Sequence, residues 1–149
     1  PENRWPRVDI KSTSLLPNVL AKQQAKEAGA REAWFVAPDG TVTEGASTNA
    51  WIVTSDGRIL TRPAEEGILR GITRTVVMKV AAGEGLRVEE RAFTVEEARR
   101  AREAFVTAAT QVVMPVVRID GTAVANGKPG SIATALRAAF HRYAEGGAS

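Results

Sequence analysis

The chain has 149 residues, of which 44% are hydrophobic and 25% charged, and its formal net charge is +3. This length and composition predict one globular domain with a sizeable core and exclude a disordered chain. No apolar run approaches the ~20 residues that span a bilayer, and the absence of Cys excludes a disulfide framework or a thiolate metal site. We therefore expect a cytoplasmic protein without membrane contact.

The basic residues are interleaved with acidic ones. Between residues 87 and 102 the arginines are separated by two pairs of glutamates, and aromatic residues make up only 5% of the chain. Proteins that bind nucleic acid gather Lys and Arg on one stripe and place aromatic residues among them. The pattern indicates a solvated surface, and we expect no nucleic-acid partner.

The first predicted elements are a short strand over residues 7–10 and a helix over residues 15–28. Lys11 opens the polar turn between them. Pro17 suits the first turn of the helix, where its missing N–H costs little, and Gly29 suits the position after its end.

Two strand–turn–strand units follow, each around a turn that contains Asp-Gly. Their strands are predicted over residues 32–37 with 41–43, and over 50–54 with 58–61. A glycine-rich stretch over residues 67–71 then leads into a helix over 72–84.

The second half of the chain begins with a strand over residues 86–91. Thr94 and Glu97 match a capping box, in which each side chain accepts from the other residue's backbone N–H, and a short helix follows. The remaining predicted elements are a strand over 104–107, a hairpin of 116–119 with 122–125, a helix from 131 to about 144 and a loose tail over 146–149.

Strands and helices are mixed along the chain, and no internal repeat is visible. This order predicts a mixed α/β fold: one domain over residues 1–149 in which a mixed sheet, forming a partial barrel, is packed by helices.

Lysine chemistry is the first candidate for function. Lys11 follows a predicted strand directly, and a strand end can present a side chain to a cleft. A desolvated lysine loses its proton more easily and becomes a nucleophilic amine. From the residues alone, a merely exposed Lys11 remains the alternative. The other lysines are expected to be solvated on helices or in a turn: Lys22, Lys26, Lys79 and Lys128.

Three further segments contain candidate ligand contacts. Gly71–Thr73 opens a helix, where free N–H groups favour an anion; the alternative is an N-cap without a ligand. Ala108–Thr110 forms a second small turn after a strand. Glu44 is expected in a loop between two strands, close enough to meet a ligand; the alternative is a solvated Glu in a hairpin connection.

Other chemistries lack their motifs. His141 is the only histidine and is expected on the surface of the last helix. One His and no Cys leave no zinc ligand set. The phosphate-loop and dinucleotide fingerprints and the serine nucleophile elbow are also missing.

Taken together, these segments resemble the class IV (fold type IV) aminotransferases, most closely the D-amino-acid aminotransferases. The order and spacing match to about Tyr143. The segments that carry the resemblance are Asp9–Ser12, Leu15–Gln23, Val42–Asn49, Gly67–Arg74, Phe105–Thr110 and Pro115–Val116.

The resemblance implies a cofactor, pyridoxal 5'-phosphate, and a role for each site residue. Lys11 would be the catalytic lysine that holds the cofactor as a Schiff base. Glu44 would pair with the pyridine nitrogen. Leu69 would pack against the ring, and the phosphate would be held by Ile72, Thr73, Ala109 and Thr110. The implied reaction converts D-amino acids to 2-oxo acids, with 2-oxoglutarate or pyruvate as acceptor.

Three positions depart from the family pattern. Ser14 stands where relatives often have Asn, and Ala109 replaces a hydroxyl residue that commonly touches the phosphate. Leu16 stands where branched-chain aminotransferases commonly have Tyr, which favours the D-amino-acid group. Branched-chain aminotransferase, (R)-selective amine transaminase and aminodeoxychorismate lyase activities share the cofactor residues and stay open.

Family members also have a smaller N-terminal domain, and their active site lies at a dimer interface. The resemblance therefore implies that this chain is the C-terminal large domain, that the N-terminal domain is absent from it, and that the protein is a homodimer. A non-catalytic isolated domain is the alternative from a different functional class.

Overall fold

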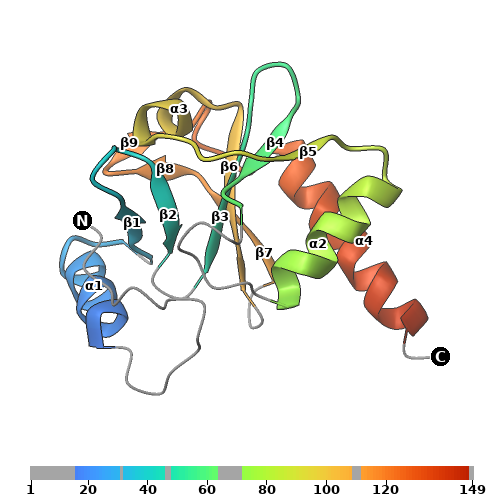
Figure 1. Ribbon diagram of the computed structural model, residues 1–149, viewed down its shortest axis with the longest axis horizontal. Helices are drawn as coiled ribbons and strands as arrows, with labels where there is room; N and C mark the ends of the chain where they lie inside the picture. The colour runs from blue at the N-terminus through green and yellow to red at the C-terminus, as the bar shows by residue number, and fades with distance from the viewer. Residues whose placement is uncertain (1–15, 31, 46–47, 64–71, 109–111, 148–149) are drawn as a thin grey trace.

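The computed structural model describes residues 16–30, 32–45, 48–63, 72–108 and 112–147, which Figure 1 shows in colour. A five-stranded sheet forms the centre of the fold, in the order β5-β4-β3-β6-β7. Neighbouring strands are antiparallel except for β4 and β5, which are parallel. The strands are β3 (Asn49–Val53), β4 (Ile59–Thr61), β5 (Val88–Glu90), β6 (Glu103–Ala108) and β7 (Val112–Val116).

The sheet lies between two layers (Figure 1). Helices α2 (Ile72–Gly83) and α4 (Ser131–Gly147) cover one face. The other face meets α3 (Val95–Arg100) and two small hairpins, β1 (Trp34–Val36) with β2 (Val42–Gly45) and β8 (Arg118–Ile119) with β9 (Thr122–Ala123). The mixed α/β class is confirmed, and the partial barrel stays a prediction.

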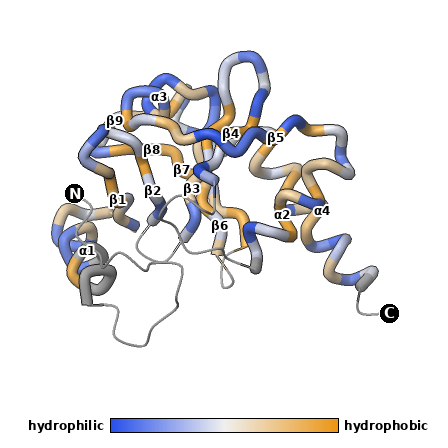
Figure 2. The backbone as a smooth tube through the Cα atoms, in the orientation of Figure 1, coloured by the Kyte–Doolittle hydropathy of each residue, from blue (hydrophilic) through white to orange (hydrophobic). Residues whose placement is uncertain are grey.

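Alternation along β3 divides the core in two, because successive side chains of a strand point to opposite faces. Trp51 and Val53 join the cluster under α2 and α4, whereas Ala50 and Ile52 join the cluster under α3. Trp51 is fully buried, and burying a side chain of this size contributes about 3 kcal/mol. In Figure 2, hydrophobic residues follow β6 and β7 in the centre, and hydrophilic ones cover α3 and the β3–β4 turn.

The edge strand β7 was not predicted. Its sequence does not alternate, and Pro115 counts against a strand, but an edge strand tolerates proline because one side of its ladder is unpaired. Pro115 pairs with Phe105 in the register. Val112, the first residue of β7, has φ 59°, a backbone conformation that strains a β-branched residue.

Most other predicted elements are confirmed. The helix predicted over 15–28 is α1 (Leu16–Glu27), and Gly29 ends it at φ 82°, as its predicted place requires. The capping box of Thr94 and Glu97 is present. The loose tail was wrong for Gly146 and Gly147, because α4 continues through both. The strand predicted over 7–10 lies outside the described residues.

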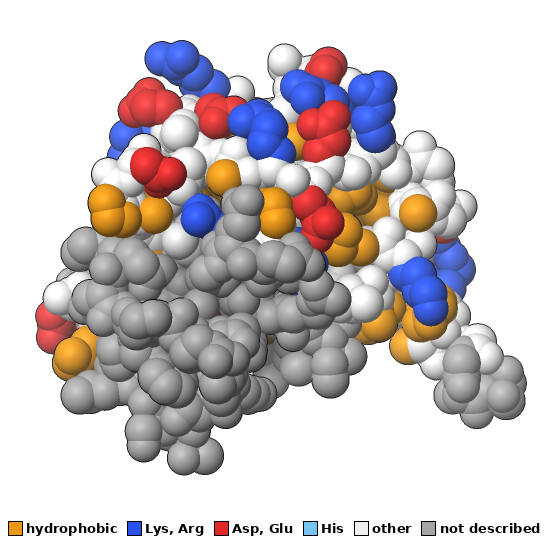
Figure 3. All heavy atoms as spheres, viewed as in Figure 1, with side chains coloured by type: hydrophobic (Ala, Val, Ile, Leu, Met, Phe, Trp, Pro, Cys, Tyr) orange, Lys and Arg blue, Asp and Glu red, His pale blue; other side chains and the backbone are white. Residues whose placement is uncertain are grey.

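Charges of both signs share the surface above β4, β5 and α3, where Figure 3 shows blue and red side chains interspersed. Arg58, directly before β4, makes an ion pair with Glu89 of β5 at 3.0 Å, and Arg99 pairs with Asp120 at 2.8 Å. Exposed pairs of this kind contribute little, typically below about 1 kcal/mol each. Within the described ranges, no helix is both long and apolar enough to cross a bilayer.

Candidate active site

Glu44 lies inside β2 and is only 6% exposed. The expected loop position was therefore wrong, and so was the alternative of a solvated Glu in a hairpin connection. The Nδ2 of Asn49 donates to Glu44 Oε2 at 3.2 Å. A buried carboxylate is costly unless it is hydrogen-bonded or paired, so this side chain is held in place rather than displayed to water.

Gly45, the last residue of β2, has close neighbours. A Cβ on Gly45 would overlap Thr48 Oγ1 and come within 3.2 Å of the Glu32 carboxylate. The Oγ1 of Thr48 is buried and has no hydrogen-bond partner among the described residues. Such an orphaned hydroxyl calls for an explanation, and contact with a bound polar group is one.

The first turn of α2 carries an unusual charge. Helix N-termini favour acidic residues because free N–H groups make that end positive, yet the third residue of α2 is Arg74, only 2% exposed. Arg74 Nη2 donates to the Arg62 carbonyl at 2.9 Å and to Glu90 Oε1 at 3.0 Å. Positive charge at an already positive helix end suits a nearby anion.

The end of β6 reaches the same region. Thr107 pairs with Asn49 in the sheet register, and its Oγ1 accepts a hydrogen bond from Trp51 Nε1 at 3.0 Å. Arg74 Cζ lies 5.8 Å from the centre of the Trp51 ring. The start of α2, the end of β6 and the Glu44–Asn49 pair are thus linked through buried contacts. Figure 1 shows the first turn of α2 close to the lower end of the sheet.

The predicted site residues fall into two groups. Glu44 and Thr73 are described: Glu44 is buried and Thr73 half-buried in the first turn of α2. Ile72 begins α2, as predicted, although its side chain lies outside the described residues. The other four residues also lie outside them: Lys11, Leu69, Ala109 and Thr110.

Sequence reasoning missed the roles of Asn49, Trp51, Arg74 and Thr107. Period-two alternation along the strand predicted over 50–54, extended back by one residue, would have placed Trp51 on the same face as Asn49. An arginine in the first turn of a helix, against the usual preference, was the other available signal.

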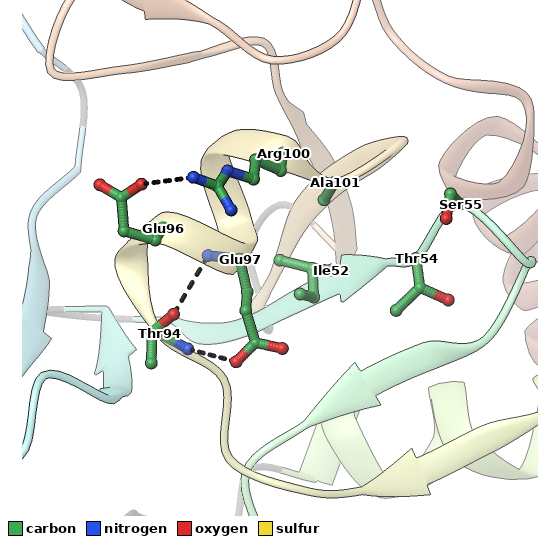
Figure 4. A pocket seen from close by; sticks show the side chains of 8 residues that line it. All are labelled: Ile52, Thr54, Ser55, Thr94, Glu96, Glu97, Arg100 and Ala101. Carbon is green, nitrogen blue, oxygen red and sulfur yellow. Dashed lines mark hydrogen bonds and ion pairs between the residues drawn. The ribbon is translucent and has the colours of Figure 1, made fainter.

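A surface depression beside α3 is separate from this region (Figure 4). Among the residues that line it, Thr94 and Glu97 form the capping box, and Arg100 makes an ion pair with Glu96 at 3.7 Å. The Arg91 side chain, which hydrogen-bonds Glu97, lowers the pKa of that carboxyl. His141 is exposed, as predicted, and the described part of the chain holds no cluster of metal-binding residues.

Known proteins share both the sequence and this fold. The profile of the family amino-transferase class IV matches residues 1–119. A D-alanine aminotransferase of Staphylococcus haemolyticus is 44% identical over 142 residues, 95% of this chain and 50% of the relative. One of Bacillus licheniformis is 44% identical over 137 residues, 92% of this chain and 48% of the relative.

The branched-chain amino acid aminotransferase of Thermobaculum terrenum, solved in its PLP form, superimposes with a TM-score of 0.88. It is 32% identical, and the match covers 95% of this chain and 46% of that one. The chain thus spans about half the length of the relatives it matches. On the family match, the identity and the shared fold, the chain belongs to the class IV aminotransferases.

Proposed function

We propose that the protein containing this chain transaminates D-amino acids to 2-oxo acids, with pyridoxal 5'-phosphate as cofactor and 2-oxoglutarate or pyruvate as acceptor. The observation that carries the proposal is the buried Glu44 carboxylate, held by Asn49 in the β2–β3 segment. The two D-alanine aminotransferases, each 44% identical, support the substrate class.

The residues present fit this cofactor. Its phosphate needs an anion site, and α2 begins with backbone N–H groups that a helix does not pair internally, next to the buried Arg74. Its ring nitrogen needs an acidic partner, and Glu44 is a carboxylate screened from water. The protein solved from Thermobaculum terrenum, with the same fold, is in its PLP form.

When bound, pyridoxal phosphate supplies an aldehyde that condenses with amines and a protonated ring that accepts electrons. Glu44 would hold the proton on the pyridine nitrogen, since a carboxylate in surroundings of low dielectric attracts a neighbouring cation more strongly than in water. Asn49 would keep that carboxylate in position through its hydrogen bond.

Lys11 would bind the cofactor covalently through Nζ. Once the substrate amine has displaced it, the freed amine would move the proton from the substrate α-carbon, a step worth on the order of 10²–10⁴ in rate. Leu69 would pack against the ring. The phosphate would be held by Ile72 and Thr73 with Ala109 and Thr110.

We place the remaining contacts in the half of the relatives that this chain does not span. The residues that contact the substrate carboxylate would lie in that other half. The chain itself would be the C-terminal, cofactor-binding domain of a homodimer. This arrangement accounts for the coverage of about half of each relative.

The test compares Lys11→Ala with Lys26→Ala, whose side chain is exposed on α1. In the intact protein, Lys11→Ala is expected to lose D-alanine-dependent pyruvate formation by 10²-fold or more, and Lys26→Ala to keep it. Borohydride reduction of the holo protein should leave a pyridoxyl tag on Lys11, detected by peptide mass. Undiminished turnover of Lys11→Ala, or a tag elsewhere, contradicts the assignment.

Branched-chain substrates are the second candidate, because the solved protein with the TM-score of 0.88 is a branched-chain aminotransferase. A panel of D-alanine, D-glutamate, L-leucine and L-valine separates the two. Faster turnover of the L-amino acids would replace the D-amino-acid proposal and leave the roles of Lys11 and Glu44 unchanged.

A further inference from the structure

Trp51 joins two segments that lie far apart in the sequence. Its indole ring stacks on Phe105 of β6, with ring centres 5.5 Å apart and an angle of 11° between the planes. Its Nε1 donates to Thr107 Oγ1 at 3.0 Å. The Arg74 guanidinium lies 5.8 Å from its ring centre. The ring therefore connects the end of β6 to the first turn of α2.

All of these groups are buried. Trp51 and Phe105 are 0% exposed, Thr107 1% and Arg74 2%. Buried side chains in a close-packed core have little freedom to adjust, so the contacts constrain the separation of the two segments. The Trp51–Thr107 hydrogen bond links a side chain of β3 to one of β6, and losing one partner would leave the other unsatisfied.

Arg74 also has contacts besides the one with Trp51. It contacts the carbonyl of Arg62, the residue after β4, and the carboxylate of Glu90, the last residue of β5. Its Nε is buried and meets no acceptor in the part of the chain that the structure describes. The Arg74 guanidinium is thus paired with a carboxylate and still has one buried donor that these contacts leave unused.

The neighbours of these residues are the proposed phosphate contacts. Thr73 immediately precedes Arg74, and Ala108 follows Thr107 and leads into the second proposed contact segment. A phosphate held from two segments requires their separation to be set to within a fraction of an ångström. We propose that Trp51, Arg74 and Thr107 are positioning residues: they fix the distance between the end of β6 and the first turn of α2, and through it the affinity of the protein for the cofactor phosphate. This inference rests on the proposed function.

The experiment must separate positioning from ordinary core packing. Pyridoxal lacks the phosphate of pyridoxal 5'-phosphate and forms the same bond to lysine, so the ratio of the two dissociation constants isolates the phosphate contribution. Both are measured on the intact protein by titrating the absorbance of the imine band. Urea unfolding of each variant gives its stability separately.

Thr107→Val removes the hydroxyl and keeps the shape of the side chain. It is expected to weaken pyridoxal 5'-phosphate binding by about tenfold while pyridoxal binding changes less than about twofold. Thr107→Ser retains the hydroxyl and should restore the ratio. Trp51→Phe keeps a ring beside Phe105, removes the same hydrogen bond and should match Thr107→Val. Trp51→Phe also tests the inference if Thr107→Val does not fold.

Thr61→Val is the matched control. Thr61 lies on the opposite side of Trp51 in the register, is 1% exposed, and its Oγ1 donates to the Ala50 carbonyl at 3.0 Å. This variant should lose stability and keep the ratio. A ratio unchanged in Thr107→Val and Trp51→Phe, or shifted equally in Thr61→Val, overturns the inference. Absence of any Lys11 adduct in the wild-type protein overturns the proposed function and, with it, this inference.

Discussion

The carboxylate of Glu103 on β6 accepts a hydrogen bond from the backbone N–H of Ala133, 3.0 Å away in the first turn of α4. Its other oxygen accepts from the N–H of Ile132 at 2.9 Å. A strand residue thus satisfies two of the N–H groups that a helix leaves unpaired at its start. Glu103 is 5% exposed, and its negative charge lies at the positive end of the helix dipole.

Replacing Glu103 by Gln is expected to lower the free energy of unfolding by about 2 kcal/mol. One acceptor oxygen becomes an NH2 group that faces a backbone donor, and the favourable charge is lost. Urea unfolding monitored by tryptophan fluorescence measures the change. Glu145→Gln, exposed near the end of the same helix, is the control and should stay within about 0.5 kcal/mol of wild type.

Two glycines of the C-terminal region are expected to respond to alanine in opposite directions. A Cβ on Gly130 would overlap the Glu103 side chain, so Gly130→Ala should destabilise by about 1–3 kcal/mol. Gly146 lies in α4 with open space around it, so Gly146→Ala should stabilise by up to about 1 kcal/mol. Thermal unfolding of both variants checks the signs, and two changes of the same sign would contradict the packing described for Gly130.

A similar contrast is expected for two buried threonines. Thr48 Oγ1 has no hydrogen-bond partner within the described ranges, so Thr48→Val should raise the free energy of unfolding by about 1 kcal/mol in the absence of cofactor. Thr61 Oγ1 donates to a carbonyl, so Thr61→Val should lower it by about 1–2 kcal/mol. Chemical denaturation of the apo proteins measures both changes in the free energy of unfolding. Destabilisation by Thr48→Val would show that its hydroxyl has a partner.

A single substitution should measure how much the capping box of α3 contributes to the free energy of unfolding. Thr94 Oγ1 accepts from the Glu97 backbone N–H at 3.1 Å (Figure 4). Thr94→Ala is expected to cost about 1 kcal/mol of stability, the usual contribution of such a cap. Ser55→Ala, an exposed position beside the same depression, is the control and should be neutral in the same denaturation assay.

Stability should fall on acidification partly through Glu97. The Arg91 side-chain hydrogen bond, with the Thr94 backbone, lowers the pKa of this carboxyl below its ordinary value of 4.5. A pKa that folding depresses contributes stability above the unfolded value, and the contribution is lost as pH falls through the folded value. Glu97→Gln should therefore be less stable than wild type at pH 7, and the difference should shrink below about pH 4.5. The effect is small because the side chain is partly exposed, and a difference independent of pH would contradict it.

Much of the local structure could be predicted because it depends on neighbouring residues. The helix over Ile72–Gly83 follows from its apolar period, and the Asp120-Gly121 turn follows from a dipeptide that accepts positive φ, 50° and 78° here. Strand β7 could not be predicted in the same way. Pro115 is acceptable there because β7 is the edge strand of the sheet that the described residues form, a fact that no local window contains.

The candidate site, too, could be predicted from the sequence only in part. The sequence by itself determined the family and its motif residues, including Glu44 and Thr73, because their types and order are a property of the chain. Only the tertiary structure decided that Glu44 is buried in a strand, that Glu103 caps a helix about 30 residues away, and that Trp51 meets both Arg74 and Thr107. These contacts join residues remote in sequence, and strand register and helix packing, which depend on the whole fold, bring them together.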